Sequence, residues 1–216
     1  SKGVNLDIDA SNFQIHYSNQ RGGGLETITY WYSKEHFTDK VKIKSSHVEV
    51  TGTPTATNTL PGPTFADLHS VEDVQLTDNT LINNTHLNTN FNVYSYYLDS
   101  ASIQSRGLVS NGVEINFDSG YSQSSRISVT DSQISSGRLR LVGYNNPATS
   151  LEIDGLVLSG TVNDSPRVLN LYSGGWDNIV DSSISVSNVL IKDLSISDQP
   201  GSIMHVSAWY SGQVNI

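Results

Sequence analysis

Aromatic residues recur from residue 94 onward, and two carboxylates stand beside them. The aromatics are Tyr94, Tyr121, Tyr144, Tyr172, Trp176 and Tyr210. Asp118 precedes Tyr121, and Asp177 directly follows Trp176. Tyrosine and tryptophan rings offer flat apolar faces with a polar handle, so sugar rings can stack on them. Pairs of carboxylates cleave glycosidic bonds. We therefore expect a saccharide site with Asp118 and Asp177 as its catalytic candidates.

Further charged residues offer alternatives at the same site. Arg138 and Arg140 are two residues apart, so on a strand they share one face. They could hold an anionic sugar or stabilise an enolate. Glu114 and Glu152 are alternative carboxylates. A second interpretation stays open, in which the rings form a structural ladder or a subunit contact and the acids are ordinary solvated charges.

A repeated apolar template predicts the elements that must position these residues. It reads aliphatic, any, aliphatic, four of any, aliphatic, and it starts at Val74, Ala101, Ile127, Leu151 and Ile184. These starts are 27, 26, 24 and 33 residues apart. Two earlier matches start at Leu6 and Val41, which makes seven candidate coils. Self-similarity at such a period is typical of a solenoid.

A third apolar segment follows in each of the last five coils, for example Phe91/Val93 and Leu139/Leu141. Alternation at period two indicates short strands with one buried face. Stacked coils would lie about 4.8 Å apart and bury a continuous core. The predicted fold is all-β, a right-handed parallel β-helix of about seven coils. A β-sandwich also has many short strands, but it does not require the same triplet at a near-constant phase.

Composition excludes several function classes. The chain has 216 residues, with 12 basic and 21 acidic side chains and a net charge of -9. Nucleic-acid binding needs a basic footprint, and an anionic membrane surface would repel this chain. No cysteine is present, so no disulfide or thiol chemistry is expected. The six histidines show no metal-ligand spacing, and we expect neither a metal nor a cofactor.

The organisation indicates one solenoid domain over residues 1–216. Residues 51–70 contain three prolines and are expected to be an irregular insertion. Asparagines near one corner, Asn79, Asn83, Asn84 and Asn88, are expected to hydrogen-bond along the stack. The chain begins and ends on strand-like segments without polar caps. We therefore expect it to be a piece of a longer protein, or to have its ends covered by neighbours in an oligomer.

The repeated triplets, the Asn-, Ser- and Gly-rich corners, the acidic balance and the absence of cysteine resemble the pectate-lyase-like superfamily. Within it the chain looks most like a phage tailspike or capsular-polysaccharide depolymerase. The resemblance implies a homotrimer that binds polysaccharide along the side of the solenoid, outside the cell or on a virion tail. Of the polygalacturonase motifs, only Asn-x-Asp has a match, Asn5-Leu6-Asp7.

Three functions remain open at this point. The first is a tailspike-like protein that binds and degrades extracellular bacterial polysaccharide, by hydrolysis or by elimination. The second is a non-catalytic β-helical adhesin or the shaft of a receptor-binding spike. The third is a secreted bacterial lyase or epimerase. Likeness of fold alone does not choose among them.

Overall fold

The computed structural model describes residues 4–16, 25–27, 38–51, 64–85, 88–163, 167–175, 181–197, 202–209 and 212–216. Every regular element in these ranges is a β-strand. The strands are β1 (Val4–Asp9), β2 (Asn12–His16), β3 (Leu25–Thr27), β4 (Thr38–Lys44), β5 (His47–Thr51), β6 (Thr64–His69), β7 (Val71–Thr77), β8 (Thr80–Asn83), β9 (Thr89–Tyr96), β10 (Ser100–Arg106), β11 (Val109–Asn111), β12 (Val113–Gly120), β13 (Ser124–Ser135), β14 (Arg138–Tyr144), β15 (Ala148–Asn163), β16 (Arg167–Gly174), β17 (Asp181–Ser197), β18 (Ser202–Ala208) and β19 (Gly212–Asn215).

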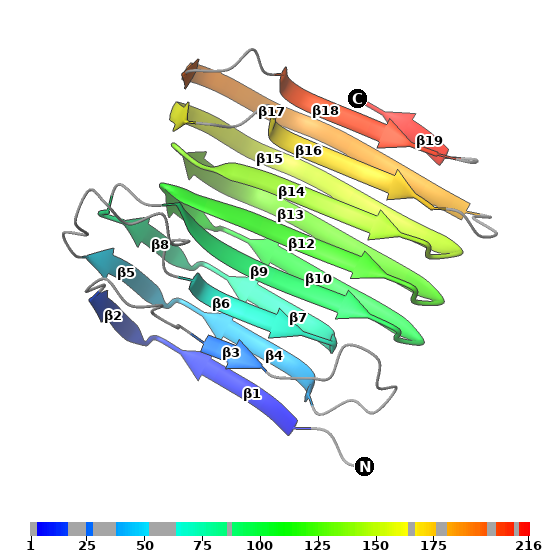
Figure 1. Ribbon diagram of the computed structural model, residues 1–216, viewed down its shortest axis with the longest axis horizontal. Helices are drawn as coiled ribbons and strands as arrows, with labels where there is room; N and C mark the ends of the chain where they lie inside the picture. The colour runs from blue at the N-terminus through cyan, green and yellow to red at the C-terminus, as the bar shows by residue number, and fades with distance from the viewer. Residues whose placement is uncertain are drawn as a thin grey trace, which may run out of the picture.

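The strands form two parallel sheets in which each strand pairs with its counterpart one winding further along the chain. Sheet A has 12 strands and contains the path β1-β4-β7-β10-β13, which β15, β17 and β19 continue. Sheet B has seven strands in the order β18-β16-β14-β12-β9-β6-β3. Figure 1 shows the windings stacked from β1 at one end to β17, β18 and β19 at the other. The prediction of an all-β chain with parallel strands is confirmed.

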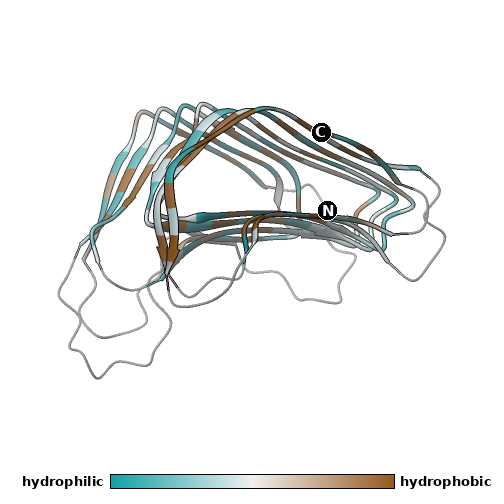
Figure 2. Ribbon diagram, turned by 90° about the horizontal axis from the view of Figure 1, so that it is seen from above, coloured by the Kyte–Doolittle hydropathy of each residue, from teal (hydrophilic) through white to brown (hydrophobic). Residues whose placement is uncertain are grey.

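Successive windings superpose when the molecule is seen from above, so that their strands surround a common interior (Figure 2). Long-range parallel pairing of this kind is compatible with a parallel β-helix or solenoid. Among the described residues, no helix is long and apolar enough to cross a membrane.

Inward-facing residues of equal register form buried columns. In sheet B one column contains Leu68, Val93, Phe117, Leu141 and Leu171, each of them 0% exposed. The Phe91 and Phe117 rings pack edge to face, with centroids 6.3 Å apart. Each strand has one such face, and a single winding could not bury it. Stacking therefore supplies the hydrophobic stabilisation.

The template is misaligned in one winding. It places Ala101, Ile103 and Leu108 in the positions that Val74, Leu76 and Leu81 occupy in the winding before. The structure instead pairs Ile103 with Val74, Ser105 with Leu76 and Ser110 with Leu81. Both serines are buried, and neither hydroxyl has a hydrogen-bond partner among the described residues. A shift by two residues keeps the same face inward, so alternation alone cannot detect it.

Residues in the left-handed conformation mark the corners, and they decide the register. One corner carries Ala10, Ser45, Asp78, Gly107, Asp131, Gly155 and Asn188, all with positive φ. The Asp78 amide donates to the Arg106 carbonyl, and the Gly107 amide donates to the Thr130 carbonyl. These bonds stack the corners and thereby set which residues pair in the following strand.

Stacked polar groups reinforce the corners, as expected for the asparagines. The Asn79 side chain is buried, donates to the Ile43 carbonyl at 2.8 Å and accepts from the Ser46 amide at 3.1 Å. Asn83 donates to the Gly112 carbonyl at 2.9 Å. Residues 52–63 of the expected irregular insertion lie outside the described part, whereas residues 64–69 form β6.

The three latest windings differ from the early ones. In β13, β15 and β17, which have 12, 16 and 17 residues, one strand runs through the corner that separates β10 from β11.

Core-face positions become exposed at the C-terminal end of the stack, where Ile191, Met204 and Val214 are 41%, 36% and 43% exposed.

Candidate functional site

The outer face of sheet B carries most of the described residues that the sequence singled out. On β12, Ile115 and Phe117 face the core, so Asn116 and Asp118 lie on the opposite face. On β14, Leu139 and Leu141 alternate with Arg138 and Arg140 in the same way. The parallel register sets Arg140 beside Asn116 and beside Asn170 of β16. The same pairing sets Asp118 between Tyr94 of β9 and Val142 of β14.

A groove of about 350 Å³ lies on this face. Two aromatic side chains, Tyr144 and Tyr172, come from adjacent strands, β14 and β16. The remaining lining residues are Tyr96, Asp118, Arg140, Val142, Arg167 and Asn170. Flat rings, cations and amide or carboxyl oxygens therefore line one hollow.

Asp118 is the most buried charged group of the groove, with only 6% of its side chain exposed. Arg140 donates from Nη1 to Asp118 Oδ2 at 3.0 Å. Burial raises the pKa of the Asp118 carboxyl from its ordinary value, and the charge of Arg140 and a hydrogen bond from Tyr96 act against this rise. Desolvation is the largest of these effects. Burial and the ion pair with Arg140 thus shift the pKa of Asp118 in opposite directions.

Two acceptor oxygens of the groove lack a hydrogen-bond partner of normal geometry among the described residues. They are Asp118 Oδ1 and Asn170 Oδ1, and both are buried. Buried polar atoms without a partner destabilise a protein, and they are uncommon. Neither atom is accessible from the groove. The accessible polar groups of the groove belong to Arg140, Arg167 and Asn170, and they suit a molecule that brings hydroxyl groups.

Tyr96 reaches Asp118 because Gly120 leaves space. A β-carbon at Gly120 would collide with ring atoms of Tyr96, so the ring lies directly over this glycine. Burial, followed by the charge of Asp118, raises the pKa of the Tyr96 hydroxyl above its ordinary value. The hydroxyl consequently stays protonated and can donate to the carboxylate.

The rings form a continuous series on one side of the groove. His69 stacks on Tyr94 at 5.0 Å, and Tyr94 stacks on Tyr96 at 6.3 Å. Tyr96 contacts Tyr97 and Tyr121, and Tyr121 meets Tyr144 edge to face at 5.5 Å. On the other side of the groove, Tyr172 lies 6.2 Å from Trp209.

The aromatic side chains of this series do not share one register. Tyr94, Asp118 and Tyr172 share one register, whereas Tyr96 and Tyr144 share the next outward register with Gly120 and Gly174. Tyr97 and Tyr121 lie beyond the strand ends, at a corner. The aromatic residues therefore occupy two registers of the sheet and one corner. Similar spacing along the chain does not place residues in the same register.

Tyr97 and Tyr121 have positive φ values of 60° and 54°. The left-handed conformation costs about 1–2 kcal/mol for a residue with a β-carbon. The two rings stack at 5.1 Å and 10°, and such a pair returns about 0.5–1.5 kcal/mol. Stacking therefore does not offset the cost of placing two tyrosines at this corner.

The two predicted arginines are both paired. Arg138 forms an ion pair with Glu114, and Arg140 forms one with Asp118. Glu114 and Arg138 line a second, polar groove of about 380 Å³ near the start of the same strands. Glu152 lies on sheet A, where it pairs with Arg126 at 2.9 Å. Glu152 is thus not part of the groove.

Three predicted residues, Trp176, Asp177 and Tyr210, lie outside the described part of the chain. The role of Asp118 and Asp177 as a catalytic pair therefore stays a prediction. Among the described residues, no three histidine, aspartate or glutamate side chains gather to hold a metal ion.

Sequence reasoning missed Asn170, Arg167 and the space above Gly120. Asn170 stands between Leu169 and Leu171, so strict alternation predicts that it faces outward. Its place beside Arg140 depends on the pairing of β14 with β16, which the sequence does not state. No local pattern indicates Arg167.

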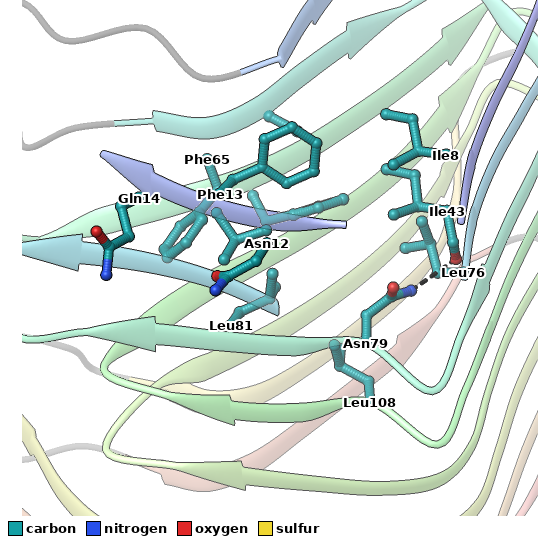
Figure 3. Close-up of a pocket in the computed structure, with 13 residues that line it drawn as sticks. Ile8, Asn12, Phe13, Gln14, Ile43, Phe65, Leu76, Asn79, Leu81 and Leu108 are labelled. Atoms are coloured by element: carbon teal, nitrogen blue, oxygen red, sulfur yellow. Dashed lines mark hydrogen bonds between the residues drawn. The ribbon is translucent and has the colours of Figure 1, made fainter. Parts of the chain in front are cut away.

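A further hollow of about 480 Å³ lies in the interior of the first windings (Figure 3). Most of its lining is apolar, including Phe65, Leu81 and Phe91. The Asn79 amide in its wall already donates to the Ile43 main chain, as the dashed line in Figure 3 marks. This hollow belongs to the core and presents no reactive group.

No protein-family model, curated protein or solved structure matches this chain. The groove on sheet B is therefore the basis of the functional proposal.

Proposed function

We propose that this chain is a phage tailspike-like protein that binds extracellular bacterial polysaccharide in the groove between Tyr144 and Tyr172. The observation that carries the proposal is the combination, in one hollow, of these two rings with the polar side chains of Arg140, Arg167 and Asn170. A sugar offers both complements, because its C–H face is apolar and its hydroxyls donate and accept hydrogen bonds.

The charges of the groove support a polyhydroxyl ligand. Arg140 and Arg167 supply N–H donors for hydroxyl or carboxylate oxygens of a sugar. The chain as a whole carries a net charge of -9, so a long polyanion held by charge alone is disfavoured. Recognition by stacking and directed hydrogen bonds fits this balance better.

The proposed scaffold is a right-handed parallel β-helix. Support comes from the parallel pairing of each strand with its counterpart one winding on and from the stacked left-handed corners. Right-handed connection is the rule for parallel strands of one sheet. Such a scaffold presents its outer faces as long, rigid surfaces for an extended chain.

Affinity electrophoresis tests the binding. The protein is run through gels that contain polygalacturonate, alginate, dextran, or bacterial capsular and O-antigen polysaccharides. We expect retardation by at least one polymer. Tyr144→Ala and Tyr172→Ala should each weaken this binding about tenfold, which corresponds to about 1.4 kcal/mol.

The matched control is Arg126→Ala, whose exposed side chain lies on sheet A, away from the groove. It should bind as the unchanged protein does. The proposal is contradicted if no polymer retards the protein. It is also contradicted if both tyrosine variants are retarded as strongly as the unchanged protein.

Cleavage of the bound polysaccharide is a second candidate activity, and the raised pKa of Asp118 favours it. A raised pKa makes a carboxyl hold its proton more readily, as a general acid requires. Asp118 would donate its proton to the glycosidic oxygen as the bond to the anomeric carbon breaks. Asp177 would take a proton from the water that attacks that carbon, as in inverting glycosidases.

Product analysis separates cleavage from binding. Reducing ends without absorbance of unsaturated uronates indicate hydrolysis, and Asp118→Asn should then abolish product formation while binding persists. Reducing ends with that absorbance indicate elimination, as in a secreted lyase. Binding without product supports a non-catalytic adhesin or spike shaft.

Assembly and location complete the proposal. We infer a homotrimer from the resemblance to tailspikes. We place it outside the cell or on a virion tail, because an extracellular polymer is met there. Sedimentation equilibrium of the purified chain tests the trimer, and a monomer at all concentrations contradicts it.

A further inference from the structure

Tyr97 and Tyr121 occupy a corner position that an asparagine fills one winding further on. The amides of Tyr97, Tyr121 and Asn145 each donate to the carbonyl at the end of the next strand in sheet B. All three residues have positive φ, between 52° and 60°. The corner therefore needs a left-handed residue with a backbone N–H, and it does not need an aromatic ring.

Asparagine adopts the left-handed conformation more readily than tyrosine does. Asn145 shows that it fits this corner, where its amide donates to the Gly174 carbonyl at 2.9 Å. The tyrosines are thus less suited to the backbone than the asparagine one winding further on. An unfavourable backbone conformation that persists is a reason to look for a function.

The two rings form a stacked pair at the surface. Their centroids are 5.1 Å apart at an interplanar angle of 10°, and Tyr121 is 45% exposed. The pair is tied to the groove, since the Tyr121 ring packs edge to face on Tyr144 of the groove. The Tyr121 and Tyr144 rings lie 5.5 Å apart. Tyr144 thus belongs to the groove and also supports the corner pair.

We propose that Tyr97 and Tyr121 form a second stacking subsite, which takes the sugar that adjoins the one in the groove. This inference rests on the proposed function, because it assumes that the groove binds a saccharide. It specifies the ligand further. The preferred ligand is a chain of several sugars that leaves the groove past Tyr144 and crosses the corner, and a single sugar would fill only the groove.

The test uses Tyr121→Asn and Tyr97→Asn with Tyr121→Phe as the matched control. The probe is the polymer most strongly retained in the panel above, both intact and as its constituent monosaccharide. We expect each asparagine variant to melt at the same temperature as the unchanged protein or higher. Binding of the polymer should weaken about tenfold, and binding of the monosaccharide should change less than twofold.

Tyr121→Phe keeps the ring and should retain most of the polymer affinity. Full polymer binding by both asparagine variants overturns the inference while the groove proposal stands. A lower melting temperature of both variants also overturns it, because the rings would then serve the fold. If the unchanged protein binds no polymer, the proposed function fails, and this inference fails with it.

Discussion

Asp118 joins the electrostatics of the groove to the stability of the protein. Its carboxyl is almost fully buried, and it forms an ion pair with Arg140. Burial acts more strongly on its pKa than the arginine does, so the folded protein holds the Asp118 proton more tightly than the unfolded chain does. The ionised form of this residue consequently opposes folding.

Asp118→Asn should therefore change the pH dependence of stability in a defined direction. As pH rises from the ordinary value of 3.8 through the raised pKa, the unchanged protein should lose stability relative to this variant. Urea unfolding at a series of pH values measures the difference.

The matched control is Asp154→Asn. Hydrogen bonds from Ser187 and Asn188 lower the pKa of Asp154, so its contribution has the opposite sign. That contribution is present above the ordinary value of 3.8 and is lost as pH falls through the lowered pKa. A flat difference for Asp118→Asn across this pH range would show that burial does not dominate its pKa.

Gly120→Ala should disturb the groove by steric means alone. The new methyl group collides with the Tyr96 ring, so stability should fall by about 1–3 kcal/mol and polysaccharide binding should weaken. Adding Tyr96→Ala removes the collision. The double variant should regain stability in thermal unfolding without regaining affinity, and a failure to regain stability contradicts the packing described for Tyr96.

Strand register is decided at the corners between the strands. A parallel strand that moves by two residues still buries the same face, which is why Ala101 was placed where Ile103 lies. The left-handed column that contains Asp131, Gly155 and Asn188 removes this freedom, since it stacks one turn on the next. In long strands such as β15 the pairing skips these residues and resumes directly after them.

Gly155→Ala should destabilise the protein by about 1–2 kcal/mol, because Gly155 has a φ of 72° and its β-carbon would lie 3.1 Å from Asp131 Oδ1. Gly155→Asn should cost less, since Asn188 takes the same position in the next winding. Thermal unfolding compares the two variants. Equal stability of Gly155→Ala and the unchanged protein would exclude a role of this corner in holding the fold.

The whole molecule is a stack whose middle is better buried than its ends. Phe117 in the middle is 0% exposed, whereas Phe13 in the first winding and Val214 in the last are 42% and 43% exposed. Each winding contacts mainly its two neighbours, so a residue at an end has a partner on one side only. The groove lies over β12, β14 and β16, within the well-buried middle.

Replacement of phenylalanine by alanine should therefore have different effects in the middle of the stack and in its first winding. Phe117→Ala should lower the free energy of unfolding by about 3–5 kcal/mol, because it leaves a cavity in the core. Phe13→Ala should lower it by about 1 kcal/mol or less. Denaturant unfolding measures both, and equal losses would contradict a gradient of stability along the stack.

The sequence by itself determined the fold class and the chemical types at the site. Burial of alternate residues is a local property, so the repeated pairs such as Ile127/Val129 and Leu151/Ile153 predict strands and their stacking without any knowledge of contacts. The aromatic residues after these strands are equally visible, and they predict a surface on which sugar rings can stack.

Only the tertiary structure decided which of these residues meet. Register set Asp118 within reach of Arg140 and Tyr96, set Asn170 beside Arg140 and divided the tyrosines between two registers and a corner. It also decided that Asp118 is buried. The physical reason is that pairing between strands far apart in sequence depends on the hydrogen bonds at the corners, and no pattern within one strand records them.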